Sequence, residues 1–354
     1  MSTSTSGATP AASSPSPAAQ WLRAVAVRPS AGVLVLLVAL CLVMMTQSAA
    51  FLTLGNWSNI VNQMVFVLLL TIGMTVVLIT GGIDLSVGSV MGLCGGVTAS
   101  LLLAGVPVGA ALVLGVVAGA GLGLVNGLLV TRLGLPDFVA TLAMLGIARG
   151  LLFLWTNGVP FIGYMTPEYR LLGGLERPFG GFTVPIILAV VVSLLSAALL
   201  RYTAIGRHAY GVGSNPDGAR LSGVPVARIR VYAYVFSGVM AGLAGVVLAG
   251  RTTTVAPTMG IGYEVQAIAA AVIGGAALTG GRGRVLGAVI GALLLTVTAN
   301  AINIAGVSST WQQVVTGSVL LLAVILDRVT TMLRTRSLVV AAPPTGSLAG
   351  ATSA

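Results

Sequence analysis

The sequence has no lysine, a single histidine, two cysteines and seven acidic residues in a chain of 354 residues. All 17 basic residues are arginines. A P-loop needs a lysine to reach nucleotide phosphates, so this chain is not itself a P-loop ATPase. Charged residues make up 7% of the chain, whereas ordinary soluble domains carry about 25%. This scarcity of charge, with 56% hydrophobic residues, excludes a soluble fold.

The residues needed for metal binding, catalysis and nucleic-acid binding are also scarce. Cys41 and Cys94 both lie inside apolar runs, and the sequence has no CxxC or Cys/His cluster, so we expect neither a metal nor a cofactor in this chain. We find no paired nucleophile and base, so we do not expect an enzyme. The arginines are scattered through short segments without interleaved aromatics, which argues against a nucleic-acid partner.

The long apolar runs predict an all-α, polytopic membrane helix bundle in contact with lipid. Because about 20 apolar residues cross the hydrocarbon layer, charges, Gly/Pro pairs and polar clusters divide the sequence into about ten spans. We expect broken or re-entrant helices near the glycine-rich segments. The predicted spans lie near residues 31–53, 59–80, 86–104, 108–130, 138–156, 183–200, 230–250, 264–280, 285–305 and 309–327, with longer loops at 157–182 and 201–229.

The distribution of arginine predicts the orientation of the bundle. Cytoplasmic loops of membrane proteins carry an excess of basic residues, and placing both termini in the cytoplasm leaves only Arg170, Arg177 and Arg251 on the far side. Residues 1–30 are rich in Ser, Thr, Ala and Pro, a composition typical of disorder. The predicted organisation is therefore a transmembrane domain at 31–328 between disordered cytoplasmic tails at 1–30 and 329–354.

The sharpest motif is Gly-Gly-Ile-Asp-Leu-Ser-Val-Gly-Ser at 81–89. Its paired glycines interrupt the helical pattern, and Asp84 is placed to cap the next helix, an interaction worth about 1 kcal/mol. Broken helices at membrane depth also line transport paths. Asp84 is therefore either a structural cap or part of a permeation path.

A second motif lies in the basic loop 201–229. Asn215 and Asp217 are suited to start a short helix, and Gly223 is suited to end it. Such a helix on the cytoplasmic face would be a contact for a partner protein. The alternative is an ordinary basic loop without a partner.

The third motif is an alanine-rich span that begins at Glu264. This acid either complements the dipole of its helix or acts in gating. Arg149 is an intramembrane charge, and so a functional candidate, unless it extends to the outer interface. Amide and hydroxyl groups inside the spans could bind a sugar or merely join helices. The candidate path residues are Asn62, Gln63, Asp84, Ser86, Asn126, Phe138, Thr141, Glu264, Asn300 and Asn303.

From about residue 55 to 328, the chain resembles the permeases of the ribose, xylose and arabinose class of ATP-binding-cassette importers. Five motifs carry the resemblance, in the family's order. They are the segment at 81–89, the segment at 135–142 with Arg149 and Gly150 beyond it, the loop at 206–224, the glycine-punctuated span at 263–284, and Gly-Val-Ser-Ser-Thr-Trp-Gln-Gln at 306–313.

The resemblance implies a permease of the bacterial inner membrane that works as a homodimeric or pseudo-dimeric unit. Separate ATPase subunits would bind ATP and magnesium, and an extracytoplasmic binding protein would deliver a monosaccharide. The loop 201–229 would then couple the permease to the ATPase. The resemblance implies these coupling residues: Arg207, Asn215, Asp217, Ala219, Arg220 and Gly223.

Two positions depart from the family pattern. Gly218 stands where the family usually has alanine, which lowers helix propensity by about 1 kcal/mol, and Gln266 stands where relatives commonly have aspartate. The sequence does not choose among ribose, xylose, arabinose, galactose, an inositol, an autoinducer-like sugar or a nucleoside. The main alternative is an ion-coupled secondary transporter that uses Asp84 and Glu264 as ion sites.

Overall fold

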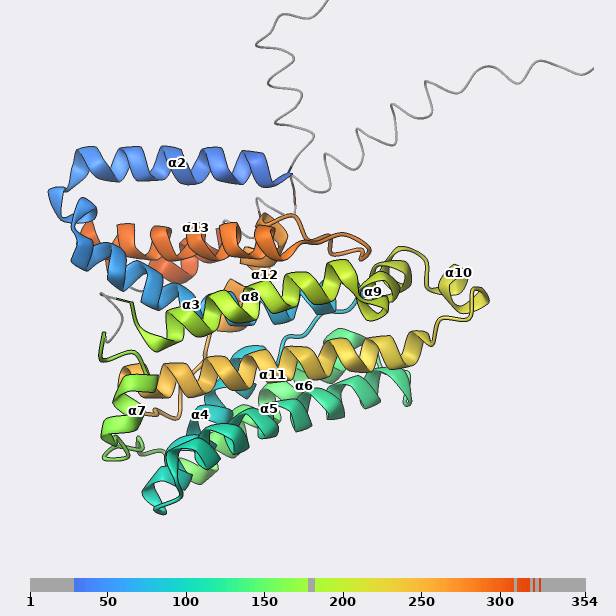
Figure 1. Cartoon of the computed structure of the whole chain (residues 1–354), viewed down its shortest axis with the longest axis horizontal. Coiled ribbons are helices and arrows are strands. Elements are labelled where there is room, and N and C mark those ends of the chain that lie inside the picture. The colour runs from blue at the N-terminus through green and yellow to red at the C-terminus, as the bar shows by residue number, and fades with distance from the viewer. Residues whose placement is uncertain (1–28, 178–181, 309–310, 319–320, 322–324, 326–354) are drawn as a thin grey trace, which may run out of the picture.

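The computed structural model describes residues 29–177, 182–308, 311–318, 321 and 325. Within these residues the chain is a bundle of helices, most of which run side by side along one axis (Figure 1). The elements are α2 (Pro29–Gln47), η1 (Ala49–Leu52), α3 (Leu54–Ile79), α4 (Val87–Leu103), α5 (Val108–Thr131), α6 (Asp137–Thr156), α7 (Pro167–Leu172), α8 (Val184–Tyr202), α9 (Ala204–Ser214), α10 (Pro216–Leu221), α11 (Val226–Thr252), α12 (Tyr263–Ile273) and α13 (Val285–Ile304).

The described part of the chain contains six helices that are long and apolar enough to cross a membrane: α3, α5, α6, α8, α11 and α13. Three shorter apolar helices, α2, α4 and α12, occupy further predicted spans. The prediction of a polytopic helical membrane protein is confirmed at this level. Within the predicted span at 309–327, the described residues 311–318, 321 and 325 are helical. The tails predicted at 1–30 and 329–354 fall outside the described residues, except that α2 already begins at Pro29.

Several predicted boundaries shift, for local reasons. The span predicted at 264–280 ends at Ile273, because Gly274 closes the helix and Gly275 adopts a φ of 93°. Helix α3 begins at Leu54, before the predicted residue 59, because the Thr53 side chain accepts a hydrogen bond from the Asn56 backbone nitrogen. The loops predicted at 157–182 and 201–229 contain the short helices α7, α9 and α10.

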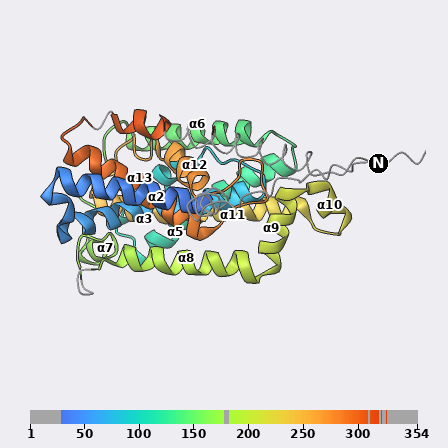
Figure 2. The same cartoon turned by 90° about the horizontal axis from the view of Figure 1, so that it is seen from above.

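Helix α3 forms the centre of the bundle. Over its most apolar stretch of 18 residues, 89% of the residues are buried. Seen from above, α6 and α8 lie on opposite sides, with α3, α11 and α13 between them (Figure 2). The lengthwise view places α7 at one end and α9 and α10 at the other (Figure 1).

Helices α5 and α11 approach so closely that glycine is required at their contact. Gly115, Gly119, Gly123 and Gly127 recur at every fourth position of α5, and so share one face of the helix. A Cβ on Gly119 would overlap the carbonyl oxygen of Gly238 in α11. Small residues of this kind allow membrane helices to pack backbone against backbone.

We predict that Gly119→Ala destabilises the protein by about 1–3 kcal/mol, because the added methyl group must force two backbones apart. Gly121→Ala is the matched control, since no atom lies within 4 Å of a Cβ at Gly121 on the same helix. The melting temperature of each purified variant in detergent tests the prediction. Equal melting temperatures for the two variants would contradict it.

Candidate functional site

The turn between α3 and α4 holds a buried carboxylate. Asp84 is 2% exposed. Its Oδ1 accepts hydrogen bonds from the Ser86 backbone nitrogen at 3.0 Å and from the Ser86 hydroxyl at 2.6 Å. Its Oδ2 accepts from the Ser237 hydroxyl of α11 at 2.8 Å. The predicted helix-capping position belongs to Ser86 instead, because Asp84 lies two residues earlier and holds the turn itself.

Other polar side chains extend this network to three helices. The Asn126 amide of α5 donates to the Ser86 hydroxyl at 2.9 Å. The Ile83 carbonyl oxygen accepts from Thr141 of α6 and from Tyr234 of α11, each at 3.3 Å. The structure thus brings together four of the predicted path residues: Asp84, Ser86, Asn126 and Thr141.

Tyr234 and Ser237 were not singled out by any sequence pattern. Both lie in the apolar run of α11, where tyrosine and serine are common packing residues. Their partners on the 80–86 turn are more than 150 positions away in the sequence, with separations of 151 for Tyr234 and 153 for Ser237. No pattern within the sequence of α11 identifies Tyr234 and Ser237 as partners of this turn.

The remaining amide candidates lie elsewhere. Asn300 of α13 and Asn56 of α3 form two reciprocal hydrogen bonds, at 2.7 and 3.2 Å. Asn62 accepts a hydrogen bond from Thr183 at 2.6 Å. These contacts join helices within the bundle. Three other candidates differ: Gln63 is half-buried, and Phe138 and Asn303 lie exposed on the bundle surface.

Glu264 meets Arg149 inside the bundle. Its Oε1 lies 3.6 Å from Arg149 Nη2 and accepts from the Gly262 backbone nitrogen at 3.3 Å. The side chains are 13% and 33% exposed, respectively. Glu264 Oε2 and Arg149 Nη2 have no hydrogen-bond partner among the described residues. The sequence left open whether Arg149 extends to the outer membrane interface. In the structure its side chain instead pairs with Glu264 and so connects α6 to α12.

The loop predicted to contact a partner contains the expected short helix. The Asn215 Oδ1 accepts from the Gly218 backbone nitrogen at 2.9 Å and so caps α10. Gly223 lies beyond the end of α10 with a φ of 79°. Helix α10 protrudes from the end of the bundle (Figure 1), with Leu221 91% exposed on it.

The other predicted residues of this loop are held by short-range contacts. Asp217 and Arg220 form an exposed ion pair at 3.2 Å. The Arg207 guanidinium donates to the Tyr202 carbonyl oxygen at 3.5 Å, and Ala219 is 9% exposed. These contacts order the segment internally and leave its outer surface open to solvent.

Helix α9 fixes this loop to the bundle by backbone contact. A Cβ on Gly213 would overlap the carbonyl oxygen of Ile79, at the end of α3. The same oxygen accepts a hydrogen bond from the Gly281 backbone nitrogen at 2.9 Å. The Tyr210 hydroxyl donates to the Gly283 carbonyl oxygen at 2.8 Å. Helix α9 therefore touches both the end of α3 and the connection between α12 and α13.

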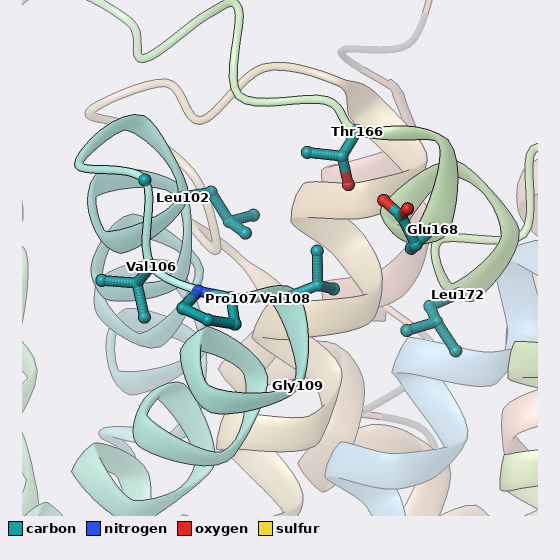
Figure 3. Close-up of a pocket in the computed structure, with 9 residues that line it drawn as sticks. Leu102, Val106, Pro107, Val108, Gly109, Thr166, Glu168 and Leu172 are labelled. Carbon is teal, nitrogen blue, oxygen red and sulfur yellow. The ribbon is translucent and has the colours of Figure 1, made fainter.

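A cleft opens at the opposite end of the bundle, between the α4–α5 turn and α7. Its volume is about 550 Å³. Figure 3 shows Val106 and Pro107 of the turn facing Thr166 and Glu168 across it. None of the predicted path or coupling residues lines this cleft, so it is separate from the polar network at Asp84.

These features define a multi-pass helical membrane protein with a buried polar turn, an ion pair between α6 and α12, and an exposed helical loop at one end. The chain belongs to the family described as the branched-chain amino acid transport system / permease component, whose model matches residues 56–324. It is therefore an inner-membrane permease subunit of an ATP-binding-cassette importer, and not an enzyme.

Curated relatives agree with this assignment. The chain is 40% identical over 296 residues to the ribose import permease protein RbsC of Escherichia coli K12, covering 83% of this chain and 92% of that protein. It is 41% identical to RbsC of Bacillus subtilis 168, covering 79% and 86%. The autoinducer 2 import system permease protein LsrC of Yersinia pseudotuberculosis IP 31758 is 36% identical, with 78% of each chain covered. No solved structure matches the chain. The membership predicted from the five motifs is confirmed.

We predict that Asp84→Ala lowers the stability of the purified protein by about 1–3 kcal/mol, because its buried donors on Ser86 and Ser237 lose their acceptor. Glu176→Ala is the control, since that side chain is 52% exposed. Thermal unfolding in detergent measures both variants. An Asp84→Ala protein as stable as Glu176→Ala would show that the network does not hold the turn.

Proposed function

We propose that the chain translocates a monosaccharide of the ribose type. An extracytoplasmic binding protein delivers the sugar, and separate ATPase subunits bind ATP and magnesium and supply the energy. The observation that carries the proposal is the extent of the likeness to RbsC, at 40% identity over 92% of the Escherichia coli protein. LsrC, an autoinducer 2 permease, is less similar at 36%.

We further propose about ten crossings, with both termini in the cytoplasm, an orientation that the distribution of basic residues favours. The α9–α10 end would then be the cytoplasmic end. Its arginines support this orientation: Arg201, Arg207, Arg220, Arg228 and Arg230 belong to α9 and α10 or flank them. The cleft beside α7 would open on the opposite side of the membrane.

Helix α10 and its flanks are the proposed contact with the ATPase. An exposed leucine at the end of a short, well-capped helix is a suitable apolar anchor for a groove on another protein. Leu221 has this position, while Asp217 and Arg220 are exposed beside it. Asn215 and Gly223 fix the two ends of the helix.

The proposed mechanism is alternating access by two copies of the permease. Closure of the ATPase subunits on ATP moves α10, and α9 passes the movement to the end of α3 and to the α12–α13 connection through Gly213. The two copies rearrange, and the sugar passes between them. The ion-coupled alternative gains little support, because both oxygens of Asp84 already accept hydrogen bonds and Glu264 is paired with Arg149.

The test is uptake of labelled solute into proteoliposomes that contain this chain, with its ATPase, its binding protein and ATP added or omitted. We expect ribose uptake only when all components are present. Leucine and autoinducer 2 are run in parallel as competing substrates. Uptake by this chain alone, driven by a proton or sodium gradient, would overturn the proposal.

We predict that Leu221→Asp lowers ATP-driven uptake about tenfold or more, because a charge replaces the apolar anchor, as expected for loss of a central contact residue. The variant should still reach the membrane, since the side chain touches little of its own chain. Leu54→Asp is the control, because Leu54 is 90% exposed and begins α3, whose opposite end at Ile79 meets α9. Unchanged uptake in Leu221→Asp would exclude α10 as the ATPase contact.

A further inference from the structure

The Arg149–Glu264 pair occupies a position that lipid cannot solvate. Arg149 is the thirteenth residue of α6, about 18 Å along the helix from Asp137 at 1.5 Å per residue. The pair therefore lies at membrane depth, yet its side chains remain 33% and 13% exposed. Charged side chains at this depth nearly always face a bundle interior or a water-filled cavity. A water-filled path beside the pair would account for this exposure.

Three of the sequence motifs converge on this pair. Arg149 comes from the motif in α6, and Glu264 begins the alanine-rich helix α12. A Cβ built on Gly262 would lie 3.9 Å from the Gln313 amide nitrogen, which belongs to the motif at 306–313. Segments far apart in the sequence therefore place a guanidinium, a carboxylate and an amide around Gly262.

The backbone beside the pair is not helical, and it packs closely against Gly88. Residues 253–262 are unwound between α11 and α12, with Gly260 at φ 90° and Gly262 at φ 85°. Glu264 Oε2 lies against Gly88, where a Cβ would overlap it. The Glu264 carboxylate thus packs against the backbone at Gly88, and its Oε2 has no hydrogen-bond partner among the described residues.

Several other polar groups in the bundle are engaged, although Ser89 Oγ, Asn126 Oδ1 and Arg230 Nε are also buried without a hydrogen-bond partner among the described residues. Asp84 accepts from Ser86 and Ser237, and Asn300 is paired with Asn56. In contrast, Glu264 Oε2 and Arg149 Nη2 have no hydrogen-bond partner within the described part of the chain. A carboxylate acceptor and a guanidinium donor side by side match the donor and acceptor of a sugar hydroxyl pair.

We infer that Arg149, Glu264 and Gln313 form a contact site for a polyhydroxylated solute within the membrane. This inference rests on the proposed transport function and names the residues that the solute meets. The carboxylate accepts hydrogen bonds from the solute hydroxyls, and the guanidinium and the amide donate to them. The 3.6 Å pair keeps the two charges close until the solute occupies the space between them.

The first test measures ribose uptake and ATP hydrolysis together in proteoliposomes holding the complete transporter. We expect Arg149→Ala and Glu264→Ala each to lower uptake about tenfold or more, the loss expected for hydrogen bonds to charged groups. ATP hydrolysis stimulated by the binding protein should persist. The control is Arg170→Ala with Glu176→Ala, an ion pair at 3.9 Å whose side chains are 54% and 52% exposed.

Exchange of the two charges distinguishes a solute contact from a structural link. The double variant Arg149→Glu/Glu264→Arg restores an ion pair between α6 and α12 but reverses the groups that the solute meets. We expect uptake to stay low in this variant. Uptake restored to the unmodified level, or single variants with full uptake, would overturn the inference.

The second test needs no transport and remains informative if a charge variant fails to fold. Gln313→Cys is placed in a chain whose two natural cysteines are replaced by Cys41→Ala and Cys94→Ala. The complete transporter in nanodiscs then reacts with a water-soluble maleimide. We expect ribose to slow this reaction at least about threefold, whereas betaine at equal osmolarity leaves it unchanged. Arg170→Cys is the control and should react at one rate in both solutions.

The two tests separate the site from the proposed function. Protection of Gln313→Cys without any uptake would support the site and refute ribose transport. Uptake by the unmodified transporter, without protection and with full activity in Arg149→Ala, would support transport and refute the site.

Discussion

The close contact between the backbones of α5 and α11 is the interaction on which the rest of the bundle depends. Lipid tails are as apolar as leucine, so membrane helices gain little from hiding apolar surface and associate through close packing. Gly119 and Gly238 provide that packing. The same approach brings Tyr234 and Ser237 of α11 within hydrogen-bonding distance of the 80–86 turn. The close approach of α5 and α11 and the buried network at Asp84 therefore share helix α11.

The positions of most helices could be predicted from the sequence, because apolar runs end where charges, prolines and paired glycines begin. The short helix α10 was predictable because Asn215, Asp217 and Gly223 act within a few residues of one another. The early end of α12 was missed. Hydropathy continues past Ile273 through small apolar residues, and only the backbone conformation of Gly275 shows that the helix has stopped.

The candidate site was less predictable, because its partners are distant in the sequence. Asp84 was recognised as important, yet a local pattern could not show that its second oxygen is used by Ser237. Arg149 and Glu264 were each noticed separately, and nothing in either segment indicates the other. Asn300 looked like a path residue, since an amide inside a span has the same sequence signature whether it binds a solute or pairs with Asn56.

The contact at Gly213 connects α9 directly to the end of α3 and to the connection between α12 and α13. Helix α9 rests on Ile79 and Gly281 through main-chain atoms, with no compressible layer of side chains between them. A displacement of α9 would therefore act directly on the end of α3 and on the α12–α13 connection. Glycines with positive φ lie on either side of α12, at Gly260 and Gly262 before it and at Gly275 after it. Helix α12 is thus a short regular helix bordered at both ends by glycines in the left-handed region.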